Sequence, residues 1–248
     1  MIEALPSTLA ALTLEISGFN EPDPDPFSFV ALPIGSFVMG GSDDDRFVTS
    51  VELPRQTSRV SSPIAMGRSP VTVGDWHKFR PAQFARSDIA VLPMVDITWD
   101  DAIAYTEWLS DVSGRTCRLP TEAEWEYASR AGKEGLFPSG RNQISPREAN
   151  FLYNERGEPI GCGYRTPIGC YPPNAFGLYD MSGNVSEWTS SPWRKGHHQA
   201  FNEHDGRRVI RGGSWDQLPR TLRCSWRDWA WESATCDNLG FRVVVELD

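Results

Sequence analysis

Residues 133–185 restrict the possible folds of this chain more than any other stretch, because almost nothing in them is periodic. They show neither the 3.6-residue spacing of an amphipathic helix nor the alternation of a strand. Irregular segments of this length are uncommon in compact domains unless they are functional. The 19 prolines and 21 glycines are spread along the chain, which indicates many turns rather than a linker. We therefore expect one domain with much ordered irregular chain, held by packing, turns or bound ions.

Two capped helices are predicted just before this stretch. The first covers residues 97–114, with a threonine at its start and a glycine at its end. The second covers residues 118–132, the segment RLPTEAEWEYASRAG. In it, Thr121 and Glu124 form a capping box and Gly132 stands at the C-cap position. These helices are the two main helices that we expect in the fold.

Short strands are predicted at both ends of the domain. Residues 27–41 suggest two strands that meet at a turn, and residues 207–215, 221–229 and 239–247 are short runs of β-branched and aromatic residues. Two helices, scattered short antiparallel strands and much irregular chain give an α+β fold class with low regular secondary structure.

The charge and the N-terminus exclude several classes of protein. The net charge is −9 and the sequence has no cluster of Lys and Arg, which argues against a nucleic-acid partner. No apolar run is long enough to span a membrane. Residues 1–26 are acidic and broken by prolines, so we expect an N-terminal lead-in arm there and the domain over residues 27–248. This N-terminus lacks the cationic region of a signal peptide, and five cysteines are an odd number, so we expect reduced thiols and a cytoplasmic protein.

Several segments, in order, resemble one family. They are residues 118–132, NAFGLYDMSGNVSEW at residues 174–188, RVIRGGSW at residues 208–215 and NLGFRVV at residues 238–244. Their order and wording strongly resemble the formylglycine-generating enzyme family, also called sulfatase-modifying factors. FVALPIGSFVMGG and GRSPVTVGDW fit the opening of that family, so the resemblance extends from about Phe27 to the C-terminus. It implies a C-type-lectin-like fold.

The resemblance leaves the function open, because the same fold occurs in formylglycine-generating oxidases, ergothioneine-type sulfur–carbon bond-forming enzymes, the pyoverdine-maturation oxidase group and the diversified binding proteins of retroelements. We favour a divergent oxidoreductase-like member that acts on a peptide or a peptide-derived metabolite. The alternatives are a non-catalytic module that binds an unknown protein or small-molecule ligand, as the variable proteins of diversity-generating retroelements do, and a scaffold in a larger complex.

Formylglycine generation in the family uses two cysteines, a few residues after the GGS turn, that hold copper. Thiolates are soft ligands that suit Cu(I). The positions that align with this pair are Gln217 and residues 218–222, and none is a cysteine. We therefore expect neither copper nor formylglycine generation. Cys224 matches a structural cysteine of the family, and Ser129 stands where its disulfide partner would be.

An iron site of the ergothioneine type is also unsupported. His197 and His198 lie in a polar segment and are expected to be solvated loop residues. The acidic run of residues 43–45 is likewise expected to be a solvated loop. Trp125, Glu126 and the paired glycines of RVIRGGSW are expected to be framework, because glycine alone tolerates a tight turn at positive φ.

The resemblance also implies a structural calcium ion in DMSGNVSEW. Its ligands would be Asp180, Gly183, Val185 and Glu187, the middle two through backbone carbonyls. Calcium takes hard oxygen ligands of this mixed kind. The alternative is that both carboxylates only cap turns. A second calcium site of the family should begin near Asn150, but no suitable aspartate follows it.

A ligand-binding surface is predicted between residues 216 and 237. Trp and Arg dominate binding hot spots, and this segment is rich in both. The alternative is that the tryptophans form the core of a strand. The candidate binding residues are Arg220, Arg223, Trp226, Arg227, Trp229 and Trp231.

Overall fold

A computed structural model describes residues 11–13, 28–81, 87–195 and 205–247 of the chain. Most of the predicted lead-in arm, as well as His197 and His198, lies outside these residues. The helices are α1 (Val73–Phe79), α2 (Trp99–Ser113) and α3 (Glu122–Arg130), and the short 3₁₀ helices are η1 (Ser50–Glu52), η2 (Ser87–Ile89) and η3 (Pro219–Thr221). No helix of the described residues is long and apolar enough to cross a membrane.

The strands form two larger sheets and one hairpin. The five-stranded sheet has the order β1 (Ala11–Thr13), β2 (Ser28–Leu32), β5 (Ile64–Gly67), β11 (Val244–Glu246), β6 (Cys117–Arg118). The four-stranded sheet has the order β10 (Leu239–Phe241), β7 (Ser186–Pro192), β8 (Arg207–Arg211), β9 (Arg227–Trp231). The hairpin pairs β3 (Gly35–Met39) with β4 (Gln56–Val60). Only β10 and β7 pair in parallel among these strands. β1 belongs to the predicted lead-in arm, yet it pairs with β2.

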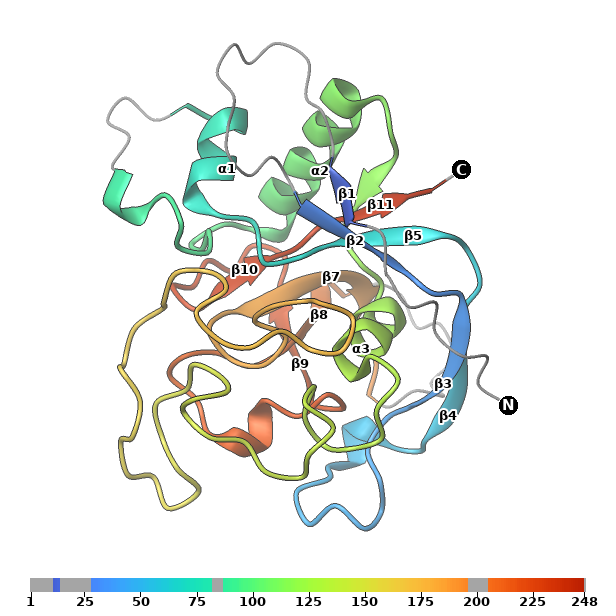
Figure 1. Ribbon diagram of the computed structural model, residues 1–248, viewed down its shortest axis with the longest axis vertical. Helices are drawn as coiled ribbons and strands as arrows, with labels where there is room; N and C mark the ends of the chain where they lie inside the picture. Colours follow the sequence, from blue (N-terminus) through green and yellow to red (C-terminus); the bar gives the residue numbers. More distant parts are fainter. Residues whose placement is uncertain (1–10, 14–27, 82–86, 196–204, 248) are drawn as a thin grey trace.

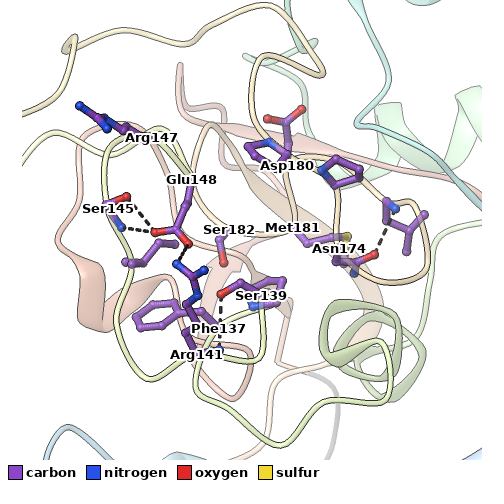
Figure 2. A pocket seen from close by; sticks show the side chains of 15 residues that line it. Phe137, Ser139, Arg141, Ser145, Arg147, Glu148, Asn174, Asp180, Met181 and Ser182 are labelled. Carbon is purple, nitrogen blue, oxygen red and sulfur yellow. Dashed lines mark hydrogen bonds and ion pairs between the residues drawn. The ribbon is translucent and has the colours of Figure 1, made fainter.

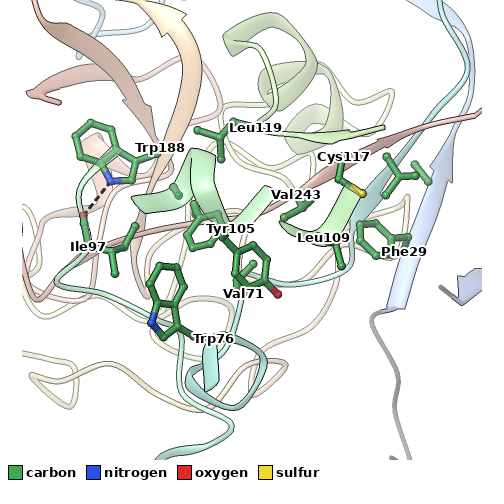
Figure 3. Packing of buried hydrophobic residues seen from close by; sticks show 14 of the residues in the cluster. Phe29, Val71, Trp76, Ile97, Tyr105, Leu109, Cys117, Leu119, Trp188 and Val243 are labelled. Carbon is green, nitrogen blue, oxygen red and sulfur yellow. Dashed lines mark hydrogen bonds between the residues drawn. The ribbon is translucent and has the colours of Figure 1, made fainter. Parts of the chain in front are cut away.

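Figure 1 shows α1 and α2 on one side of the five-stranded sheet and the four-stranded sheet with the long loops on the other. The largest buried cluster contains residues of α1 and α2 and of both larger sheets. In it Trp76 of α1 stacks on Tyr105 of α2 with 5.7 Å between the ring centroids. Trp188 of β7 belongs to the same cluster and donates a 3.4 Å hydrogen bond to the carbonyl of Ile97 (Figure 3). The cluster therefore joins the helical half to the four-stranded sheet.

Both predicted helices are confirmed, with one correction. α2 has Thr98 as its N-cap and ends at Gly114, and α3 begins after a capping box of Thr121 and Glu124. The left-handed C-cap of α3 is Ala131, one residue before the glycine predicted there. α3 ends one residue early because Ala131 itself adopts the turn, with φ 46°.

The two strands predicted within residues 27–41 are confirmed as β2 and β3. The strand predicted at residues 221–229 is wrong for most of its length, because η3 ends at Thr221 and β9 begins only at Arg227. β2 and β3 do not pair with each other across their turn; β2 pairs with β1 and β5, and β3 pairs with β4. The irregular stretch is confirmed, since no helix or strand lies between α3 and β7. A small cluster of Phe137, Ala149, Phe151 and Leu222 packs this stretch against the segment that follows β8.

Candidate ligand-binding site

The glycine turn after β8 lies directly on α3. Gly212 and Gly213 have φ of 94° and 67°, which L side chains rarely adopt. A Cβ at Gly212 would lie 3.1 Å from the Trp125 ring. The two sequence segments that carry the family resemblance therefore meet, and their glycines allow the backbone to approach the tryptophan closely.

Trp125 and Glu126 are fully buried framework residues, as predicted. The Trp125 Nε1 donates to Glu187 Oε2 at 2.7 Å. Glu126 accepts from Arg211 at 2.5 Å and from Arg130 at 2.7 Å. Burial alone would raise the pKa of Glu126, but the two arginines outweigh it and hold the pKa below its usual value. α3 and β8 are thus joined by buried ion pairs.

The segment after the turn carries a polar cluster and a buried leucine where the resemblance aligns the copper cysteines. Ser214 Oγ donates to Asp216 Oδ1 at 2.6 Å, and Asn238 Nδ2 donates to both oxygens of Asp216 at 3.1 Å. The next residue, Gln217, has a buried Oε1 without a hydrogen-bond partner. Leu222 is fully buried in the small cluster under the irregular stretch. None of these side chains is a soft metal ligand.

Cys224 lies against Ser129, as the resemblance implies. Ser129 Oγ lies 3.3 Å from Cys224 Sγ, and both side chains are buried. Burial raises the pKa of the Cys224 thiol, so this cysteine is a packed neutral thiol.

A pocket of about 300 Å³, here called the Glu155 pocket, opens beside η3. Arg46, Glu155 and Arg220 line it together with apolar side chains such as Phe137, Ile144 and Phe151. Glu155 Oε1 accepts from the backbone N–H of Arg220 at 2.9 Å. Glu155 Oε2 is buried without a hydrogen bond and lies 3.9 Å from Arg220 Nη1, beyond hydrogen-bond distance. Glu155 therefore lines the pocket with an Oε2 that is closed off from solvent and accepts no hydrogen bond from the described residues.

Arg223 borders this pocket, but its guanidinium is already engaged. It is 1% exposed and pairs with Glu52 at 2.8 Å and with Asp45 at 2.5 Å. Asp45 is buried, so the expectation that residues 43–45 are a solvated loop is wrong for this residue. The arginine withdraws that carboxylate from solvent and fixes the 42–53 loop against the pocket.

Arg227 does not lie on an exposed surface, which corrects its assignment to the binding face. It is 3% exposed and pairs with Glu122 at 2.6 and 2.8 Å. Trp226 is half-buried, with the Arg223 guanidinium 5.9 Å from its ring centroid. These two residues support the sheet edge and the loop beside it.

Trp229 and Trp231 form an aromatic pair on β9. Their rings meet edge to face at 5.5 Å, and Trp231 is 50% exposed. Arg207, which lies outside the predicted binding segment, places its guanidinium 4.8 Å from the Trp229 ring centroid. The strand-core alternative therefore does not describe Trp231.

Of the four predicted calcium ligands, Asp180, Gly183 and Val185 lie in the loop that leads into β7, and Glu187 lies in β7 itself. Asp180 is buried, has φ 55° and accepts from the Gly169 N–H at 3.0 Å. Burial, together with a smaller contribution from the nearby Glu187 carboxylate, raises the pKa of Asp180 to about 6. Glu187 is fully buried, and Arg242 donates to both of its oxygens at 2.7 Å. Among the described residues, no group of three or more His, Cys, Asp or Glu side chains is placed so that it could hold a metal ion.

The place expected for a second calcium site contains a thiol. Cys162 Sγ lies 3.3 Å from Asn150 Oδ1 and 3.3 Å from the carbonyl of Tyr164. Asn150 also donates to the Tyr164 carbonyl at 2.9 Å and to Asn184 at 3.2 Å. Side-chain hydrogen bonds thus hold this turn.

A second pocket, here called the Glu148 pocket, has a volume of about 520 Å³. Figure 2 shows Glu148 hydrogen-bonded to Ser145 and Arg141 on its wall. Glu148 accepts from Arg141 at 3.2 Å and from Ser145 Oγ at 2.8 Å. Asp180 lies on its wall.

The chain was compared with known proteins. Residues 18–247 match the family model described as the sulfatase-modifying factor enzyme 1-like domain. The formylglycine-generating enzyme of Mus musculus is 36% identical over 172 residues, which is 62% of this chain and 44% of that protein. The inactive C-alpha-formylglycine-generating enzyme 2 of Mus musculus is 36% identical over 164 residues, 62% of this chain and 49% of that protein. The chain spans about half the length of these relatives.

Two solved structures are similar over nearly the whole chain. PvdO from Pseudomonas aeruginosa has a TM-score of 0.77 and 31% identity, covering 96% of this chain and 100% of that one. Treponema denticola variable protein 1 has a TM-score of 0.72 and 21% identity, covering 96% and 99%. The second likeness shows the shared fold alone.

Proposed function

Because the chain belongs to the sulfatase-modifying factor enzyme 1-like domain family, we propose that it binds a peptide or a peptide-derived metabolite beside the glycine turn, without copper–thiolate oxidation. The relative named formylglycine-generating enzyme and the one named inactive C-alpha-formylglycine-generating enzyme 2 are equally similar to it, at 36% identity. Overall identity therefore assigns no activity. The side chains that follow the glycine turn bear on the activity more directly than overall identity does, and they do not include the two thiolates.

This proposal rests on which residues occupy the segment after the glycine turn and on the pocket that the segment lines. Gln217 and Leu222 occupy it in place of the cysteines, while Pro219 and Arg220 of the same segment line the Glu155 pocket. Small-molecule sites combine apolar walls with a few polar groups, and this pocket has both. Its volume suits a ligand the size of one or two amino-acid residues.

A structural calcium ion is part of the proposal. Asp180 supplies a buried carboxylate that accepts from the Gly169 N–H, and a bound cation would balance its charge. Gly183 and Val185 would add carbonyl oxygens, and Glu187 would share its carboxylate with Arg242. The donor set is all oxygen, which suits calcium. When bound, the ion would hold the irregular stretch against β7.

Peptide binding is tested by thermal unfolding with a library of short peptides. A ligand that binds only the folded state raises the melting temperature by mass action. Arg220→Ala should reduce the shift, whereas Arg115→Ala, an exposed arginine between α2 and β6, should not. The proposal is wrong if no peptide raises the melting temperature, or if Arg220→Ala responds like the wild type.

A protein-binding module is the second candidate, and the exposed ring of Trp231 beside Arg207 favours it. This candidate predicts that Trp231→Ser loses a stoichiometric protein partner that Arg220→Ala retains. Loss of the partner in Arg220→Ala alone would instead favour the pocket.

A further inference from the structure

We propose that the Glu148 pocket binds a small organic carboxylate with an apolar body, and that the Arg141 guanidinium holds the carboxylate. This site is separate from the one in the proposed function, because Arg141 lines the Glu148 pocket and not the Glu155 pocket, and Arg220 lines the Glu155 pocket and not the Glu148 pocket. The inference therefore goes beyond the proposed function and does not depend on it.

The first support is that the acceptor groups of the pocket already have donors within the protein. Glu148 Oε1 accepts from Arg141 at 3.2 Å, and Glu148 Oε2 accepts from the Ser145 hydroxyl at 2.8 Å and from the Ser145 N–H at 3.1 Å. Asn174 Oδ1 accepts from two backbone N–H groups, at 3.0 and 3.1 Å. A cationic ligand would therefore compete with Arg141 and Ser145 for Glu148.

The donors of the pocket, in contrast, are largely uncommitted. A guanidinium has five N–H donors. Among the described residues, the Arg141 guanidinium makes one hydrogen bond, from Nη1 to Glu148. The Arg141 side chain is 73% exposed, so a ligand can reach the donors on Nε and Nη2. The Ser139 hydroxyl accepts from the Arg141 backbone N–H at 3.4 Å and keeps its own hydrogen to donate. The groups that a ligand can reach are thus donors, which favours an anion.

The charges of the lining are arranged in the same sense. Arg141 and Arg147 both contribute positive charge to it. Asp180 also lines the pocket, but it is 6% exposed and accepts from a backbone N–H at 3.0 Å. Figure 2 shows its carboxyl group directed away from Arg141. The accessible charge near Arg141 is therefore mainly positive.

Local hydrogen bonds hold the guanidinium in place before a ligand binds. The Phe137 N–H donates to the Arg141 carbonyl at 3.1 Å, and the Gly140 N–H donates to the Phe137 carbonyl at 2.8 Å. Figure 2 shows the Arg141 side chain directed toward Glu148, whose bond occupies only one of its nitrogens. The neighbouring N–H groups on Nε and Nη2 suit two-point recognition of a carboxylate. A group that is already oriented loses little freedom on binding.

The walls around this guanidinium favour an apolar body on the ligand. Proline rings contribute to them, and these lose no rotamer freedom when a ligand covers them. The volume of about 520 Å³ is within the range of small-molecule sites, and a carboxylate alone would leave most of it unfilled. The apolar residues of the lining are Phe137, Pro138, Ile144, Pro172, Pro173, Leu178 and Met181.

The test is isothermal titration calorimetry with 3-phenylpropanoate and its uncharged amide. We expect the acid to bind and the amide to bind about tenfold more weakly or worse, because hydrogen bonds to a charged acceptor are the stronger ones. Arg141→Gln should weaken the acid by a similar factor and leave the amide unchanged. Arg141→Lys keeps the charge without the planar fork and should give an intermediate affinity.

The matched control is Arg156→Gln, which changes an exposed arginine of the same irregular stretch that lines neither pocket. It should bind the acid like the wild type. Equal melting temperatures establish that all of these variants are folded. Acetyl-alanyl-phenylalanine, titrated in the same way, tests the carboxylate of a peptide as the source. Tighter binding of this peptide than of 3-phenylpropanoate, lost in Arg141→Gln, supports the site with a peptide C-terminus as its ligand.

The opposite outcomes overturn the inference and leave the proposed function standing. They are an acid that does not bind, equal affinities for acid and amide, and an unchanged affinity in Arg141→Gln. Arg220→Ala should bind the acid like the wild type. Loss of the acid in Arg220→Ala, with binding retained in Arg141→Gln, would place the carboxylate in the Glu155 pocket and contradict this site.

Discussion

Asp180 is a buried carboxylate in a turn, and its environment makes the stability of the metal-free protein depend on pH. Its pKa is raised from 3.8 to about 6, mainly by burial. The folded state therefore binds the proton more tightly than the unfolded state, and stability falls as the pH rises from about 4 to about 6. At 1.36 kcal/mol per pKa unit, the loss is on the order of 2–3 kcal/mol.

Asp180→Asn removes this charge and keeps an oxygen for the Gly169 N–H. In the presence of a chelator, the variant should match the wild type near pH 4 and exceed its free energy of unfolding by about 2–3 kcal/mol above pH 6.5. Urea unfolding at a series of pH values measures the difference in free energy of unfolding between the variant and the wild type. The other titrating groups are the same in both proteins, so their contributions cancel in this difference. A difference that does not change with pH would show that Asp180 is already compensated in the folded protein.

At the scale of elements, Arg223 joins the loop that contains η1 to the segment that contains η3. Arg223→Leu leaves Asp45 and Glu52 buried without a counter-charge, which should cost about 3–5 kcal/mol in the free energy of unfolding. Arg220→Ala, whose side chain is 47% exposed, should cost about 1 kcal/mol or less. Chemical denaturation of both variants measures their free energies of unfolding, which can then be compared. Equal stability of the two would mean that the buried pairs do not hold the loop.

The elements that the sequence predicted are those with local signals. α2 and α3 were found because a capping threonine starts each of them and a hydrophobic face follows. α1, with only seven residues, is too short to show a period, although Thr72 and Asp75 form a capping box. The partner of β2 could not be predicted, because a sheet neighbour more than 30 positions away leaves no local trace.

The candidate site was predicted only in part, for the same reason. Arg220 was found because it lies in an arginine- and tryptophan-rich segment. Glu155 and Arg46 come from irregular chain with no periodic pattern, and only the fold brings them together. Arg223 was misjudged because its partner Asp45 is 178 positions away and looks like part of an exposed acidic run.

For the whole molecule, the open question is what holds residues 133–185 in place. If calcium binds at Asp180, Gly183, Val185 and Glu187, a free concentration 100 times the dissociation constant adds about 2.7 kcal/mol. Addition of a chelator should then lower the melting temperature by about 5–10 °C, and restored calcium should reverse the change. Asp180→Asn should show no response. A wild-type melting temperature that is indifferent to both additions would mean that Asp180 and Glu187 only cap turns and form ion pairs.

We propose that this family member has exchanged the copper–thiolate site for a ligand pocket. The most direct measurement is mass spectrometry of a sulfatase-type cysteine peptide incubated with the protein, oxygen, a reductant and Cu(I), beside the Streptomyces coelicolor formylglycine-generating enzyme as the active control. With Gln217 and Leu222 at the aligned positions, the peptide should keep its cysteine under conditions in which the control converts it to formylglycine. Copper-dependent conversion by this protein would contradict the account.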